Sequence, residues 1–199
     1  MATRQDLRND LKNKLVSLED GGYGDFEFSD TEYNTYLDLA VARLYPALYK
    51  KVSKGPLTVV GYGRNLLGYV TDSTNTVQYD RVFLVEDATE LTAIVGWSSR
   101  PDKLVGFDTQ LYTTCNVYWI DAIILPSDDV EPSGIPAMFE PLVNLGALIE
   151  ALEARQDTGV RGEPQPTGPY FTTQLLDRLK PRYDSLRTEL AMAMPGMVL

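Results

Sequence analysis

The order of apolar and polar positions divides the chain into helical, extended and again helical stretches. Residues 3–18 carry leucines at helical spacing opposite charged side chains, which predicts an amphipathic helix with one buried face. Thr3, with Asp6 three residues later, is placed to cap this helix, and the glycine-rich residues 21–24 to end it. The leucines of the buried face are Leu7, Leu11, Leu15 and Leu18.

A second helix is predicted to begin after Ser29, because Glu32 completes a capping box with it. Apolar residues continue at helical spacing over residues 33–48, and Pro46 is expected to bend the end of the helix. Gly55-Pro56 is expected to stop it. The side chains expected to interact with its C-terminal dipole are Lys50, Lys51 and Lys54.

Residues 55–125 change to short segments rich in Val, Thr and Tyr, separated by Gly, Asp, Ser, Asn and Pro. Their close spacing predicts six or seven antiparallel strands that close into a small barrel or sandwich. Gly61, Gly63 and Gly68 are interpreted as hairpin glycines, since their spacing does not match a nucleotide-binding motif. The predicted strands are 57–60, 66–70, 77–79, 82–85, 91–97, 103–107 and 111–124.

Helical spacing returns after Pro132-Ser133-Gly134, with Pro136 expected near the first helical position. Gly146 lies inside this third helix and predicts the close approach of another backbone. Residues 158–169 are interpreted as an extended loop, and residues 172–193 as a last helix kinked at Pro181.

These elements predict an α+β fold, in which a four-helix bundle-like domain carries an antiparallel β-barrel or sandwich inserted between helices two and three. The predicted domains are residues 1–54 plus 126–199, which are helical, and residues 55–125, which form the β insertion.

Composition then narrows the functional classes. The net charge is −10 and no segment is basic, which argues against a protein that grips nucleic acid. Histidine is absent, so the usual general base and zinc ligand are missing, and we expect no enzyme. Cys115 is the single cysteine and is predicted to be a buried thiol in a reducing compartment. No signal peptide or membrane-spanning run is predicted.

Four groups of side chains were weighed as sites, and no catalytic, cofactor or metal residue is assigned among them. Asp128, Asp129 and Glu131 suit a divalent cation, but their spacing favours a solvated loop before a helix. Asp6 and Asp10 form a surface pair one helical turn apart. The aromatic side chains of the β region are interpreted as core or subunit contacts, with base or sugar stacking as the alternative. They are Tyr62, Tyr69, Tyr79, Trp97, Tyr112, Tyr118 and Trp119.

The end of the chain is the fourth group, and it is apolar and rich in methionine. It is interpreted either as an adaptable segment that docks on a partner or as a disordered end. The candidate partner-binding residues are Met192, Met194, Met197, Val198 and Leu199.

Three stretches carry a resemblance to a known family. They are the paired N-terminal helices over residues 3–18 and 29–49, the segments 79–85 and 91–97, and an acidic loop over residues 125–132 that leads into residues 135–140 and 147–152. In this order of elements the chain resembles the head-to-tail adaptors of tailed bacteriophages. The smallest members of that family are nearly all helical, so the β insertion places this chain among the larger ones.

The resemblance implies a structural virion protein at the capsid-tail junction, made in the host cytoplasm. It implies a homo-oligomeric, usually dodecameric, ring beneath the portal, which contacts the portal protein above and a neck or tail component below. DNA would pass through the channel without specific binding. The alternatives are another neck or tail-completion protein, a ligand- or carbohydrate-binding module that uses the β-region aromatics, and a carboxylate-dependent hydrolase using Asp128 and Asp129.

Overall fold

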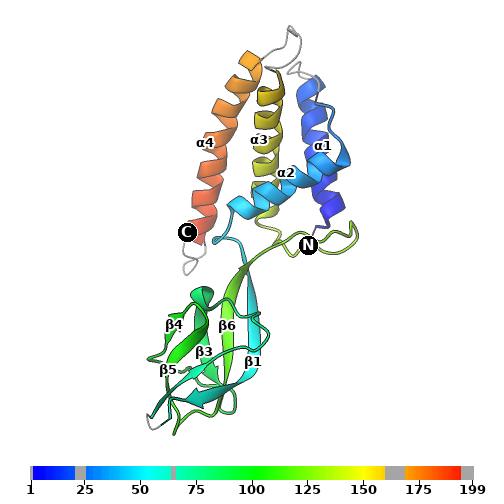
Figure 1. Ribbon diagram of the computed structural model, residues 1–199. Helices are drawn as coiled ribbons and strands as arrows, with labels where there is room; N and C mark the ends of the chain where they lie inside the picture. The colour runs from blue at the N-terminus through cyan, green and yellow to red at the C-terminus, as the bar shows by residue number, and fades with distance from the viewer. Residues whose placement is uncertain (1, 21–25, 64–65, 160–168, 194–199) are drawn as a thin grey trace. The chain divides into compact units, whose positions relative to one another are not determined.

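The computed structural model describes residues 2–20, 26–63, 66–159 and 169–193, with side chains omitted at 156–159, 169–171 and 191–193. Within these residues the fold is mixed α+β, with four α-helices and a curled antiparallel sheet of six strands (Figure 1). The chain forms two compact units, a helical unit of Met1–Leu48 with Ala122–Leu199 and a β unit of Tyr49–Asp121.

The helical unit consists of α1 (Arg4–Asp20), α2 (Asp30–Arg43), α3 (Glu140–Gly159) and α4 (Pro169–Ala193). α3 is central and packs against each of the other three helices (Figure 1). Every residue from 142 to 152 is buried, although two of them, Asn144 and Glu150, are polar. The predicted apolar faces of α1, α2 and α4 all contact this shared core.

Capping interactions set the starts of the first two helices as the sequence predicted. The Thr3 hydroxyl accepts a hydrogen bond from the Asp6 backbone N–H at 3.1 Å, and the Asp6 carboxylate accepts one from the Thr3 backbone N–H at 2.9 Å. Ser29 and Glu32 form the predicted capping box. The segment 21–24, predicted to end the first helix, lies outside the described residues.

The prediction of a close approach at Gly146 is confirmed. A Cβ atom placed there would lie 3.2 Å from the Ala40 Cβ on α2 and 3.2 Å from Cε2 of Tyr183 on α4. The missing side chain therefore lets three helices meet at one level of the core.

The predicted end of the second helix was wrong. α2 ends at Arg43, and Tyr49 already begins a strand, so Lys50, Lys51 and Lys54 belong to the sheet. Pro46 explains the early end, because proline cannot donate to the carbonyl one turn back and disfavours a helical conformation in the residue before it.

The third helix also begins later than predicted. Residues 137–139 form a turn, and α3 starts at Glu140, with Pro141 in its first turn. A helix starting at Pro136 would place the ring of Pro141 against the carbonyl of the residue one turn earlier, so the chain becomes helical only from there. α4 begins at Pro169, slightly before the predicted residue 172, and Pro181 lies inside it.

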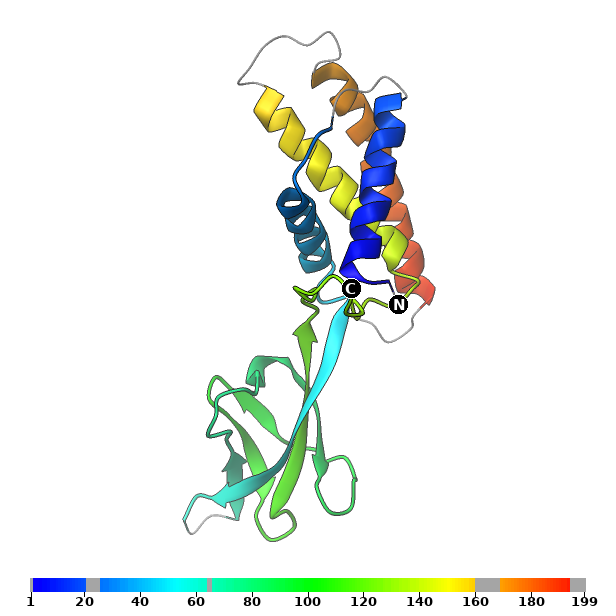
Figure 2. The ribbon, with the colours of Figure 1, turned by 90° about the vertical axis from the view of Figure 1, so that its right-hand side faces the viewer.

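The β unit contains six strands in the order β3-β6-β1-β2-β5-β4. Figure 2 shows the strands of this unit in cyan and green. The sheet curls into a half-barrel. Gly61 ends β1 and Gly68 lies in β2, which pairs with it as the predicted hairpin. The strands are β1 (Tyr49–Gly61), β2 (Leu67–Val70), β3 (Val82–Asp87), β4 (Ser98–Arg100), β5 (Lys103–Asp108) and β6 (Thr114–Ala122).

Two predicted strands are absent from the sheet. Residues 77–78 are irregular and Tyr79–Arg81 form a short 3-10 helix, because Tyr79 turns inward and its hydroxyl accepts a hydrogen bond from the Asp72 backbone N–H at 2.6 Å. Residues 91–97 make a single isolated bridge, Glu86 with Ala93. Positive φ angles at Leu91 (55°) and Gly96 (86°) interrupt a regular strand there.

A separate apolar core fills the β unit. Phe107, Leu104 and Val117 are fully buried in it. Cys115 lies in the same core, which confirms the predicted buried thiol, and burial together with the charge of Asp87 raises its pKa to about 12.

Candidate functional site

A hollow on the β unit combines exposed apolar side chains with cations, and we call it the β-face groove. It has a volume of about 960 Å³, within the range of ligand and peptide sites. Its lining comes from the end of the β1–β2 hairpin, from the β4–β5 turn and from β5. The lining residues are Tyr62, Leu66, Leu67, Arg100, Pro101, Asp102, Lys103, Val105 and Gly106.

The apolar side chains of the β-face groove are largely exposed to solvent. Leu66 is 56% and Leu67 is 53% exposed, and Tyr62 is 41% exposed beside them. Side chains of this type gain about 25 cal/mol for each Å² of apolar surface removed from water. A contiguous exposed apolar group on one face is therefore a candidate contact surface.

A bulge in β5, at Gly106, shapes this wall of the groove. The pairing of β2 with β5 shifts register between Gly68 and Tyr69, so Leu67 and Gly68 pair with Asp108 and Phe107, out of step with the following residues. A Cβ atom on Gly68 would lie 2.6 Å from the Val60 carbonyl oxygen and 2.7 Å from Cγ2 of Thr109. Glycine is therefore required at this position of β2, where the chain passes close to Val60 of β1 and to Thr109.

The cations of the β-face groove come from the β4–β5 turn. The Lys103 ammonium lies 5.2 Å from the ring centroid of Tyr69 and 3.4 Å from the Asp102 carboxylate. Tyr69 in turn packs against Tyr62, with ring centroids 5.0 Å apart. Arg100 is exposed and makes no ion pair with the described part of the chain. One carboxylate and two cations thus border an apolar floor.

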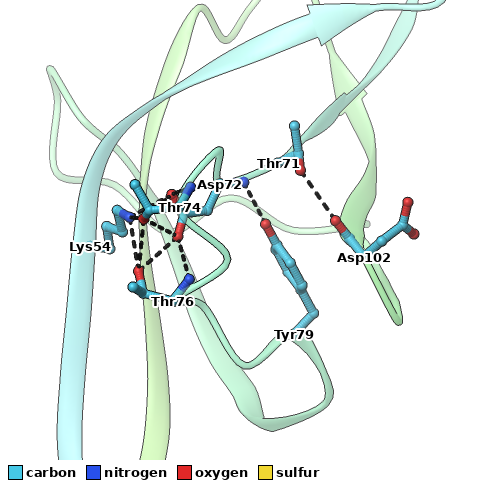
Figure 3. A network of polar contacts seen from close by, with 7 residues as sticks. All are labelled: Lys54, Thr71, Asp72, Thr74, Thr76, Tyr79 and Asp102. Atoms are coloured by element: carbon cyan, nitrogen blue, oxygen red, sulfur yellow. Dashed lines mark hydrogen bonds and ion pairs between the residues drawn. The ribbon is translucent and has the colours of Figure 1, made fainter.

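A buried polar network holds the loop that follows β2 (Figure 3). Asp72 is 2% exposed, and its carboxylate accepts hydrogen bonds from Lys54 Nζ at 2.5 Å, from the Thr76 backbone N–H at 2.8 Å and from both Thr74 and Thr76 hydroxyls. These donors hold the pKa of Asp72 far below the ordinary 3.8 of an aspartate, despite the opposing effect of burial.

The same loop supports the groove. The Thr71 hydroxyl donates to the Asp102 backbone carbonyl at 3.2 Å, which ties the end of β2 to the turn that carries Arg100 and Lys103 (Figure 3). The Asp72 network therefore supports the loop next to one wall of the β-face groove, and Lys54 contributes to this network from β1.

The acidic residues 128–131 lie on the helical unit. Asp129 pairs with Arg8 of α1 at 2.6 Å, which anchors the segment. The Asp128 carboxylate accepts a hydrogen bond from the Val130 backbone N–H at 3.0 Å. Val130 is 73% exposed between carboxylates, and Asp128 and Glu131 make no ion pair with described residues.

The other carboxylates weighed from the sequence are engaged in structure. Hydrogen bonds from Thr3 lower the pKa of Asp6. Asp10 pairs with Lys14 at 2.7 Å and accepts from the Asn144 amide at 2.6 Å. Among the described residues, no group of three or more Asp, Glu or Cys side chains is arranged to hold a metal ion. Within the same residues no helix is long and apolar enough to cross a membrane.

The predicted aromatic residues divide between core and surface. Tyr79 and Trp119 are buried, and Trp97 and Tyr112 pack against the same core. Tyr62 instead lines the β-face groove, and the half-buried Tyr69 packs against it. Of the predicted partner-binding tail, Met194, Met197, Val198 and Leu199 lie outside the described residues, and for Met192 the side chain does too.

Sequence reasoning missed Leu66, Leu67 and Arg100 as members of one site. A usable signal was present, because Leu66 and Leu67 are two consecutive apolar residues at the start of a predicted strand. Consecutive strand residues point to opposite faces, so one of the two is expected to be exposed. No such signal identified Arg100 and Lys103. They reach the groove only because β5, at the end of their turn, pairs with β2.

Comparison with known proteins adds no family assignment: no protein-family model matches the chain, and no curated protein matches its sequence.

Proposed function

We propose that this chain is a structural virion protein, a head-to-tail adaptor that forms a ring beneath the portal of a tailed bacteriophage. In this proposal the four helices act as a bundle-like domain and the β unit as an inserted, barrel-like second domain. The ring bridges portal and tail and lines part of the DNA channel. The observation that carries the proposal is the order of elements, with two helices, then all six strands, then two helices.

Charge supports the same proposal. A net charge of −10 suits the wall of a channel through which DNA slides, because a basic wall would bind the phosphates and slow their passage. Two units with separate cores also provide two independent surfaces, as a protein that joins unlike neighbours requires.

A co-sedimentation experiment tests this proposal. Portal-bearing heads without a neck, from the parent phage, are mixed with the purified chain at several salt concentrations. We expect saturable binding of the full chain and weaker binding of a chain that lacks residues 192–199. Met138→Ala is the matched control, because it removes an exposed methionine that lies outside the deleted segment. Absence of binding at every salt concentration would refute the proposal, whereas a monomeric mass in solution would not.

A neighbouring neck or tail-completion protein is the nearest variant of the same proposal. Electron cryomicroscopy of the assembled neck separates the two, because it places the chain in the layer next to the portal or in a later one.

A second candidate function is a ligand- or carbohydrate-binding module, and the β-face groove favours it. Tyr62, packed on Tyr69 and lying near two cations, forms a surface on which a sugar or an anionic ligand can stack. Glycan arrays and thermal-shift screening test this function, because a ligand that binds the folded state raises its apparent stability. Tyr62→Ala should abolish such a shift.

A further inference from the structure

We infer that the β-face groove receives residues 127–131 of a second copy of this chain. This inference rests on the proposed ring and names one contact that would hold neighbouring copies together.

The β-face groove has surface that remains to be covered. Leu66 and Leu67 are each more than half exposed on a folded sheet, and Val105 extends the same lining. Single exposed leucines are ordinary on protein surfaces, but adjacent ones inside a concave lining are typical of contact sites. An occupant of this surface should present an apolar side chain to it.

The border of the groove specifies the charge of the occupant. Arg100 is exposed without an ion pair to described residues, and Lys103 is held in place by Tyr69 and Asp102. Such side chains favour carboxylates on the incoming partner and set its orientation. Two cations against one carboxylate are too few to hold a polyanion, so this border suits a short acidic segment better than DNA.

Residues 127–131 have the complementary chemistry. Val130 is an exposed apolar side chain, and Asp128 and Glu131 on either side of it are exposed carboxylates. The Arg8–Asp129 ion pair fixes the segment to α1, and the hydrogen bond between Asp128 and Val130 orders its turn. A segment already held in one conformation loses less entropy on docking than a flexible one.

The contact joins two different surfaces of the same chain. An interface of this kind is heterologous, so each copy can bind one neighbour through its groove and another through its acidic segment. Heterologous contacts close into a ring when the rotation between neighbours allows it. The contact therefore accounts for ring formation without requiring a self-complementary surface.

Disulfide trapping between two variants of the full chain tests this inference. A Leu67→Cys chain is mixed with a Val130→Cys chain under mild oxidation, both free in solution and bound to portal-bearing heads. Cys115 stays in place, because its buried thiol with a raised pKa does not react readily. Val16→Cys, on an exposed position of α1, replaces Val130→Cys as the matched control.

We expect the mixed disulfide of the Leu67→Cys and Val130→Cys chains to form about tenfold faster than with the Val16→Cys control. Arg100→Glu with Lys103→Glu on the groove copy should remove this preference, and so should Asp128→Lys with Glu131→Lys on the other copy. Combining both reversals should restore it, because the attraction is then re-formed with opposite signs. Equal rates with the control, or no effect of the charge reversals, would overturn the inference.

The two arms keep this inference separate from the proposed adaptor function. Chains that bind heads but show no preferential trapping there would overturn the groove contact and leave the adaptor function intact. Preferential trapping in solution by chains that never bind heads would support the groove contact and refute the adaptor function. Protection of the Leu67→Cys thiol by an added glycan, with no effect of a second copy, would identify the ligand-binding function and overturn the inference.

Discussion

Replacing Asp72 with alanine should destabilise the β unit far more than replacing any exposed aspartate. Asp72 is 2% exposed, and its carboxylate is the shared acceptor of Lys54, Thr74 and Thr76. Asp72→Ala leaves the Lys54 ammonium without its carboxylate, and it leaves the backbone N–H groups of Thr74 and Thr76 without their acceptor.

The size of the effect follows from these contacts. Removing one partner of a buried ion pair costs about 3–5 kcal/mol. The Lys54 side chain is 28% exposed and is rehydrated in part, so we expect the lower end, about 3 kcal/mol. With a denaturant slope of about 1–3 kcal/mol per molar urea, the unfolding midpoint should fall by about 1–3 M.

Tryptophan fluorescence measures this change selectively. Both tryptophans of the chain, Trp97 and Trp119, lie in the β unit and pack in or against its core. Urea unfolding followed by fluorescence therefore reports on the β unit, whereas circular dichroism at 222 nm reports mainly on the helices. We expect the fluorescence midpoint of Asp72→Ala to fall while the helical transition stays in place.

Asp102→Ala is the matched control, because the Asp102 side chain is 72% exposed and its ion pair with Lys103 spans 3.4 Å. Such a surface pair contributes about 0–1 kcal/mol. A loss for Asp72→Ala no larger than for this control would refute the reasoning.

The pH dependence gives a second check on Asp72. The pKa of Asp72 in the folded chain lies far below its unfolded value of 3.8. Its stabilisation is therefore fully present above that value and is lost as the pH falls further below it. The difference between wild type and Asp72→Ala should be constant from pH 7 to about 5 and should shrink under more acidic conditions. A difference that does not change at low pH would contradict the assignment.

Three further predictions concern other parts of the chain. Gly146→Val should lower stability by about 1–3 kcal/mol in urea unfolding followed at 222 nm, because its side chain would press on Ala40, whereas Gly146→Ala should change it by less. Cys115 should react with a thiol reagent only as fast as the β unit unfolds, and rapid labelling of the native chain would contradict its burial. Deleting residues 192–199 should leave the thermal midpoint unchanged but weaken co-sedimentation with heads, since Leu190 is retained in the core; a loss of cooperative unfolding would show that the tail belongs to the fold.

Local signals in the sequence were sufficient for most of the helical unit. The Ser29–Glu32 capping box and the leucine spacing of α1 depend on neighbours within a few residues, and both were predicted correctly. The end of α2 was not predicted, because lysines are found at the C-terminal end of a helix and also on the solvent-facing side of a strand such as β1. Within β1, Lys54 contacts Asp72, 18 residues away, and no local pattern contains that pairing.

The β unit was predicted in outline but not in detail. Content of β-branched and aromatic residues indicated strands, yet residues 91–97, which include Thr, Ile, Val and Trp, follow an irregular path. The candidate site could not be predicted from local sequence patterns either. The β-face groove is assembled from a hairpin end and a later turn, so its residues become neighbours only when β2 pairs with β5.

The central position of α3 has a consequence for synthesis on the ribosome. The apolar faces of α1 and α2 emerge first, but their main partner follows only after roughly 100 further residues, which takes about 5–20 s at ordinary translation rates. The β unit, whose core is built from its own strands, is complete before then. The apolar faces of α1 and α2 that later contact α3 therefore stay exposed while the β unit folds. Aggregation or chaperone binding is expected mainly during this interval.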